Sequence, residues 1–232
     1  MAQRYGIAEI YGNSFADLCP AEIRRLSAAQ HGTEQCPFKG GKCTKSGGVC
    51  SLRLYADKGS RGAVPIGDHI VTTCPNRFHD GHAAFGWVGE TLLGTQRPGI
   101  LTELPFLLSG KEQHTARAVG KIDMVLVDSE STSDIEWCAL EMQAVYFSGA
   151  SMSTELKELR KWQDFGLPYP RGIRRPDFRS SGPKRLMPQL QIKVPTLSRW
   201  GKKMAVIVDR AFWNSLASMS QVKTRVGKPG CN

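Results

Sequence analysis

The chain has 232 residues, of which 41% are hydrophobic and 22% charged, so wholesale disorder is excluded and one large or two small folded domains are expected. No run of residues approaches the ~18 consecutive apolar positions that span a bilayer. Glu9 stands where a secretory signal would need an apolar core. We therefore expect a soluble, cytoplasmic protein with no membrane partner.

The net charge of +10 is concentrated in one segment. Residues 157–203 contain thirteen Lys and Arg and three acidic residues, a surplus of ten, so the remainder of the chain is neutral overall. A basic region on a neutral body is typical of a surface that binds a polyanion, most often nucleic acid. The alternative is a solvated basic surface that only aids solubility.

The predicted elements alternate between helices and strands after an N-terminal region with little secondary structure, residues 1–77. Within this region a helix is predicted over 21–29, and the glycines of 36–51 indicate loops and turns. Further helices are predicted over 78–94, 154–164 and 211–219, strands over 122–127, 136–147 and 204–208, and a loop over 166–188. This order predicts an α/β or α+β fold with a mixed central sheet flanked by helices.

Two carboxylates fall on the predicted hairpin of 122–127 and 136–147. Because side chains alternate along a strand, Glu141 and Gln143 share one face while Leu140 and Met142 point to the other. The hairpin can bring Asp123 beside Glu141. Paired carboxylates repel unless a cation lies between them, and their hard oxygens suit Mg²⁺. The alternative is two solvated carboxylates on an exposed sheet face.

Four of the seven cysteines, Cys36, Cys43, Cys50 and Cys74, lie in a glycine-rich stretch with few apolar residues. A metal could supply the order that this stretch lacks, and four thiolates bind either zinc or iron. Cys19 is a rival fourth ligand, and four free buried thiols are the other alternative.

These motifs together resemble the NotI-type restriction endonucleases. The resemblance is carried by Cys36-Pro-Phe, Lys42-Cys-Thr-Lys45, Gly48-Val-Cys50, Cys74-Pro-Asn-Arg77, Asp123, and Glu141-Met-Gln-Ala-Val145 with Gly149. It implies a structural iron on the four cysteines, with zinc as the alternative, in a small subdomain of residues 1–80. It also implies a PD-(D/E)xK nuclease domain over 81–232, in which Gln143 occupies the third catalytic position after Asp123 and Glu141. Glu90 and Glu103 are weaker candidates for a further acidic residue.

The function implied is Mg²⁺-dependent cleavage of double-stranded DNA by a type II restriction endonuclease, at a palindromic and perhaps GC-rich site read by a homodimer. Arginine pairs bidentately with guanine, so the candidate DNA-binding residues are the basic ones of the predicted loop: Arg174, Arg175, Arg179, Lys184 and Arg185. The alternative function is a four-cysteine metal protein that binds DNA without cutting it.

Overall fold

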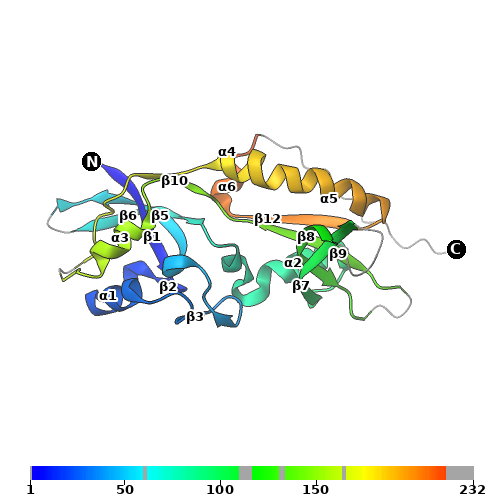
Figure 1. The fold of residues 1–232 in the computed structure, drawn as a ribbon, viewed down its shortest axis with the longest axis horizontal. Helices are drawn as coiled ribbons and strands as arrows, with labels where there is room; N and C mark the ends of the chain where they lie inside the picture. Colours follow the sequence, from blue (N-terminus) through cyan, green and yellow to red (C-terminus); the bar gives the residue numbers. More distant parts are fainter. Residues whose placement is uncertain (1, 60–61, 110–116, 131–133, 164–165, 218–232) are drawn as a thin grey trace.

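The structure, a computed structural model, describes residues 2–59, 62–109, 117–130, 134–163 and 166–217. It is a mixed α+β fold, as predicted, with two four-stranded sheets at opposite ends of an elongated molecule (Figure 1). The segment around β3 (Gln35–Cys36) and the helix α2 (Ala83–Leu93) lie between the sheets.

The N-terminal sheet is antiparallel and has the order β2-β1-β5-β6. Its strands are β1 (Gln3–Ile10), β2 (Asn13–Ser14), β5 (Val49–Asp57) and β6 (Ala63–Thr72). The prediction of little secondary structure before residue 77 was therefore wrong. The first four residues of β5 are all buried, so this strand is covered on both faces and lacks the polar alternation by which strands are predicted.

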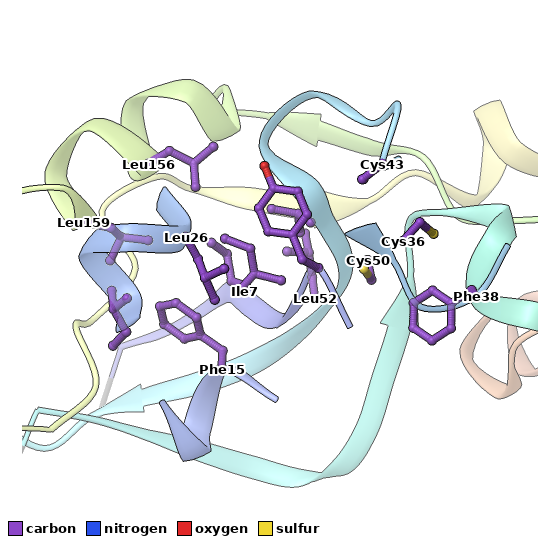
Figure 2. Packing of buried hydrophobic residues seen from close by; sticks show 14 residues of the cluster. Ile7, Phe15, Leu26, Cys36, Phe38, Cys43, Cys50, Leu52, Leu156 and Leu159 are labelled. Atoms are coloured by element: carbon purple, nitrogen blue, oxygen red, sulfur yellow. The ribbon is translucent and has the colours of Figure 1, made fainter. Parts of the chain in front are cut away.

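Two helices pack on the N-terminal sheet, α1 (Pro20–Ala28) and α3 (Met152–Leu159). α1 confirms the helix predicted over 21–29, and α3 overlaps the helix predicted over 154–164 but starts at Met152 and ends at Leu159. Figure 2 shows Leu156 and Leu159 of α3 at one end of the shared core and cysteine side chains at the other. Because α3 crosses back to this core, residues far beyond 80 help to build it. The division of the chain at residue 80 stays a prediction.

Of the loops predicted over 36–51, residues 36–48 are mostly loop, whereas 49–51 belong to the strand β5. The loop segment contains the two-residue strands β3 (Gln35–Cys36) and β4 (Gly41–Lys42) and a short 3₁₀ turn, η2 (Ser46–Gly48), before β5 begins. Gly48 has a positive φ of 63°, and a Cβ there would lie 2.3 Å from the Tyr11 ring. This close approach explains a glycine directly before the strand.

The C-terminal sheet is mixed and has the order β12-β9-β8-β7. Its strands are β7 (Gly99–Ser109), β8 (Arg117–Val127), β9 (Trp137–Gln143) and β12 (Lys203–Val208). β7, β8 and β9 form an antiparallel meander, and β12 runs parallel to β9. The predicted hairpin is confirmed in β8 and β9, although β9 ends at Gln143 and not at residue 147 as predicted. The predicted strand 204–208 is confirmed in β12.

Helices cover both faces of the C-terminal sheet. α2 (Ala83–Leu93) packs through Phe85 on Met124 and Leu140, whereas Leu197 of α5 (Met187–Arg199) packs on Val125 and Ala139. In Figure 1 α5 runs along β12. The helix predicted over 78–94 was right only from residue 83, because an irregular 3₁₀ segment, η4 (Pro75–His82), precedes it.

The prediction of a loop over 166–188 was also partly wrong. That stretch contains the strand β11 (Arg174–Pro176), the short helix α4 (Phe178–Ser181), the π-helical turn η5 (Gly182–Leu186) and the start of α5. α5 was missed altogether. The last helix, α6 (Arg210–Ser215), is shorter than the one predicted over 211–219, of which 218–219 lie outside the described residues.

Hydrogen bonds join the two halves of the molecule near Thr72, at the end of β6. Its backbone N–H donates to Asp209 before α6, and its carbonyl accepts from Val145 after β9. A second link is β10 (Phe147–Gly149), which pairs with β11. None of the helices in the described stretches of the chain is long and apolar enough to cross a membrane.

Candidate active site

The two predicted carboxylates lie opposite each other where the β8–β9 ladder ends. The last paired residues are Met124 and Leu140, so Asp123 and Glu141 occupy the next positions on their strands. Each carboxylate takes a backbone amide that the ladder no longer uses: Glu141 Oε1 accepts from Asp123 N–H at 3.4 Å, and Asp123 Oδ2 accepts from Met142 N–H at 3.0 Å. The predicted juxtaposition is therefore present.

A lysine that was not predicted completes this group. Lys193 of α5 places its Nζ 2.5 Å from Glu141 Oε1 and 2.9 Å from Gln189 Oε1. The side chains of Lys193 and Glu141 are 4% and 3% exposed, so the ion pair is buried. The signal that could have found it is the spacing of Gln189, Lys193 and Leu197, which lie on one helix face.

The electrostatic balance of the group is negative, because two carboxylates face one ammonium. Burial is the largest influence on Glu141 and raises its pKa, the Lys193 hydrogen bond opposes the rise, and the charge of Asp123 adds to it. Burial and the charge of Asp123 raise the pKa because they disfavour the anion, whereas the Lys193 ammonium stabilises the anion. A cation near Asp123 and Glu141 would relieve that cost.

Asp123 lines a cavity of about 750 Å³ between the C-terminal sheet and the loops of the cysteine segment. Met142, Glu103, His79 and Phe38 also line it. Glu103 is 76% exposed and forms a surface ion pair with Lys121. Glu90, the other weak candidate, is exposed on α2 and does not line this cavity. Asp123, which is half-buried, therefore borders this cavity, whereas Glu90 does not.

Gln143 lies two residues beyond Glu141 on β9, and its side chain is turned to its own neighbour. Its Nε2 donates to the carbonyl of Ala144 at 2.6 Å. Within the stretches of chain that the structure describes, no hydrogen bond joins Gln143 to Asp123 or Glu141.

The four predicted cysteine ligands are all buried, and none is in a disulfide. Figure 2 shows Cys36 and Cys50 near Phe38, with Cys43 farther from that ring in the same cluster. Cys74 donates its backbone N–H to the carbonyl of Cys50. Cys19, the rival ligand, is exposed and occupies the N-cap of α1, where it forms a capping box with Glu22.

Burial governs the ionisation of this region. It raises the pKa of Cys50 to about 12, and the neighbouring Cys74 and Cys43 contribute to the rise. It lowers the pKa of Lys45, a fall that Cys74, Cys50 and Cys43 oppose. Lys45 donates to the backbone carbonyl and the hydroxyl of Thr73. Three of the thiols, those of Cys43, Cys50 and Cys74, are therefore close enough to the half-buried Lys45 ammonium to affect its pKa.

Neither the thiols nor the carboxylates are arranged as a ligand shell. Among the described residues, no three or more His, Cys, Asp or Glu side chains are grouped so that they could hold one metal ion. The donor types nevertheless match two kinds of cation, thiolates a soft metal and carboxylates a hard one.

The five basic residues predicted to bind DNA separate into two kinds. Arg175, Arg179, Lys184 and Arg185 are exposed on β11, α4 and η5, and the guanidinium of Arg185 lies 4.8 Å from the centre of the Tyr146 ring.

Arg174 differs from the other four because it is buried. Its side chain is 2% exposed, and its Nη1 lies 2.8 Å from Glu155 Oε2. The guanidinium also donates to the carbonyls of Ala150 and Ser151. Arg174 therefore joins β11 to α3. Its burial contradicts the prediction that its side chain contacts DNA.

Arg174→Ala should lower the free energy of unfolding by about 3–5 kcal/mol, because it leaves the Glu155 carboxylate buried without its partner. Urea denaturation of the variant measures this loss. The matched control is Arg175→Ala, which removes the same charge from the next, exposed position and should change stability by less than about 0.5 kcal/mol. Equal stability of the two variants would contradict a structural role for Arg174.

Comparison with protein families matches residues 21–227 to the model of the restriction endonuclease NotI. Comparison with curated proteins and with solved structures gives no significant match. The matched range includes both carboxylates, Lys193 and all four buried cysteines of the N-terminal half. The chain therefore belongs to the NotI family of restriction endonucleases, enzymes that cut DNA at specific sites.

Proposed function

We propose that the chain is a type II restriction endonuclease that hydrolyses phosphodiester bonds of double-stranded DNA with Mg²⁺, using a PD-(D/E)xK-type core. The observation that carries this proposal is the Asp123–Glu141 pair at the β8–β9 strand ends, next to a cavity open to solvent. A meander of three antiparallel strands followed by a helix and a parallel fourth strand supports the assignment of the core.

The residues present fit a hard divalent cation. Asp123 and Glu141 supply carboxylate oxygens, the Met142 carbonyl adjoins them, and one lysine leaves the group with a net negative charge. Mg²⁺ bound there would acidify a water molecule and stabilise charge on the leaving oxygen.

The proposed hydrolysis transfers the phosphoryl group from O3′ to water. The water oxygen forms a bond to phosphorus and loses a proton to solvent, while the bond from phosphorus to O3′ breaks. O3′ keeps the electron pair and takes a proton, so the products are a 5′-phosphate and a 3′-hydroxyl. Gln143 can orient the water or a phosphate oxygen, provided that its amide leaves the Ala144 carbonyl.

The exposed cations of β11, α4 and η5 are proposed to contact DNA. Arg175 and Arg179 line a surface hollow of about 360 Å³ with Ser148 and Phe178. Arg175→Gln combined with Arg179→Gln should weaken DNA binding and flatten the plot of log K against log salt by about 0.9 for each phosphate that the variant no longer neutralises. Filter binding at several salt concentrations measures the slope.

The matched control for that variant removes two charges elsewhere in the basic segment, Lys157→Gln with Lys161→Gln on and just after α3. Its slope should stay closer to that of the unmodified chain. If the control flattens the slope as much as the Arg175 and Arg179 variant does, the DNA surface is not centred on β11 and α4.

A homodimer that reads a palindromic, GC-rich site is proposed with this function, since two-fold symmetric sites are read by two copies of a protein. Sedimentation of the chain with and without cleavable DNA tests it, and a single copy per site would contradict it. The four buried cysteines are proposed to hold a structural iron, or zinc, which would fix the loops of 36–48.

Incubating the chain with DNA and Mg²⁺ separates this function from the alternative, a metal-containing DNA-binding protein that does not cut. We expect double-strand cuts at one sequence, no cuts when EDTA replaces Mg²⁺, and no cuts by Glu141→Ala. Binding of DNA without any cleavage under these conditions would favour the alternative.

A further inference from the structure

The group around Glu141 contains a lysine, although the strand motif that usually carries one has Gln143 instead. We propose that Lys193 supplies the positive charge of the active site from α5, in place of a strand lysine at position 143. The inference rests on the Mg²⁺ nuclease function proposed above. It assigns a role to a residue of α5, whereas the two carboxylates lie on β8 and β9.

The position of Lys193 is fixed by the sheet and the helix together. Leu197, one turn further along α5, is buried against Val125 and Ala139 and anchors the helix on the sheet. Gln189, one turn before, accepts a hydrogen bond from Lys193 Nζ, and Glu141 accepts another. The ammonium therefore has a defined place beside the carboxylate pair.

Burying an ammonium is unfavourable unless specific partners compensate for it. An apolar side chain could fill the same space on α5, as Leu197 does, without that cost. The lysine instead stands beside one of two neighbouring carboxylates, and no salt bridge to the second, Asp123, occurs in the described stretches of the chain. Its charge thus lies beside the carboxylate pair at which the proposed reaction takes place.

An ammonium has three N–H donors, and the hydrogen bonds of the described residues use two of those on Lys193. We assign the third to an oxygen of the scissile phosphate. Charge on that oxygen grows as water attacks, so a fixed cation stabilises the transition state more than the ground state. No bond to Lys193 forms or breaks in this step.

The test uses the full chain, a DNA that it cleaves, and four variants. Lys193→Met removes the charge but keeps most of the side-chain volume. The control is Arg199→Gln, which removes a charge from the exposed end of α5. Gln143→Lys combined with Lys193→Met moves the lysine to the strand. Glu141→Gln tests the underlying nuclease site.

We expect Lys193→Met to slow single-turnover cleavage by about 100-fold, as for loss of one preorganised donor, while DNA affinity changes by less than about threefold. The double variant should recover at least about tenfold of that rate, because the charge returns to the same site. Lys193→Met should also bind Mn²⁺ more tightly at pH 8, since a competing cation next to Glu141 is gone. Arg199→Gln should cleave normally.

Cleavage by Lys193→Met at the rate of the unmodified chain would overturn the inference while leaving the nuclease function intact. So would a loss of rate that the double variant does not recover, with Mn²⁺ affinity unchanged, because Lys193 would then be only a structural partner of Glu141. Undiminished cleavage by Glu141→Gln, or no cleavage by the unmodified chain, would instead overturn the nuclease site proposed for these residues, and the role of Lys193 with it.

Discussion

Asp123→Asn and Glu141→Gln should each reduce DNA cleavage in Mg²⁺ by on the order of 10³-fold or more, because each replaces a charged metal ligand with a neutral amide of the same shape. Asn can still accept the hydrogen bond from the Met142 N–H through its carbonyl oxygen, so the strand ends should stay together. DNA binding should remain detectable, since the exposed cations of β11 and α4 are unchanged. Single-turnover cleavage and filter binding on the same samples measure both effects.

Two further carboxylates serve as comparisons for these variants. Glu136→Gln neutralises an exposed residue just before β9 that pairs with Lys202 at the surface, and it should cleave normally. Glu103→Gln neutralises the exposed carboxylate that lines the same cavity as Asp123. A large loss of cleavage in Glu103→Gln would identify it as a third acidic residue of the site. Full cleavage by Asp123→Asn or Glu141→Gln would remove these residues from the active site.

The carboxylate pair could be predicted from sequence because it depends on local pairing. Two apolar strands joined by a short polar turn pair antiparallel, and the two-residue period then fixes which side chains share a face. The register Met124–Leu140 puts Asp123 opposite Glu141, as the hairpin predicted. A motif confined to two adjacent strands needs no knowledge of the rest of the fold.

Lys193 could not be predicted in the same way. Its partner Glu141 is 52 positions away in the sequence, and the contact depends on how α5 packs across the sheet. Pro188 and Pro195 also argue against a helix in this stretch, although α5 includes both. The sequence offers a chemical signal instead. Position 143 holds Gln where the strand motif usually carries a lysine, which indicates that a cation could come from another element.

Arg174 shows the opposite error, a residue predicted at the DNA surface and found in the interior. Its charge and its basic neighbours indicated a polyanion contact, but charge alone does not reveal burial. The deciding partner is Glu155 on α3, which lies on an element that returns to the N-terminal core. Such a tertiary pairing follows from the topology of the whole chain and not from the composition of the segment.

Cys50→Ser should lose the structural metal proposed for the four buried cysteines and unfold the N-terminal half of the chain. Cys50 is buried at the start of β5, and its carbonyl accepts the backbone N–H of Cys74, so this residue connects the loops to the sheet. Because metal binding to a site absent from the unfolded chain adds its free energy to folding, elemental analysis should fall from about one iron or zinc per chain to near zero. The melting temperature should fall by about 10 °C or more, since each kcal/mol lost costs about 2–4 °C in a chain of this size.

Two cysteine controls decide what that loss means. Cys138→Ser changes a buried cysteine on β9, away from the four-cysteine region, and should keep its metal. Cys19→Ser should also keep it, because Cys19 is exposed and serine is a good N-cap for α1. Metal retained in Cys50→Ser but lost in Cys19→Ser would make Cys19 the fourth ligand. Metal retained in all three variants would show that the buried thiols pack as small apolar groups, and the order of 36–48 would then have to come from hydrogen bonds such as those between Lys45 and Thr73.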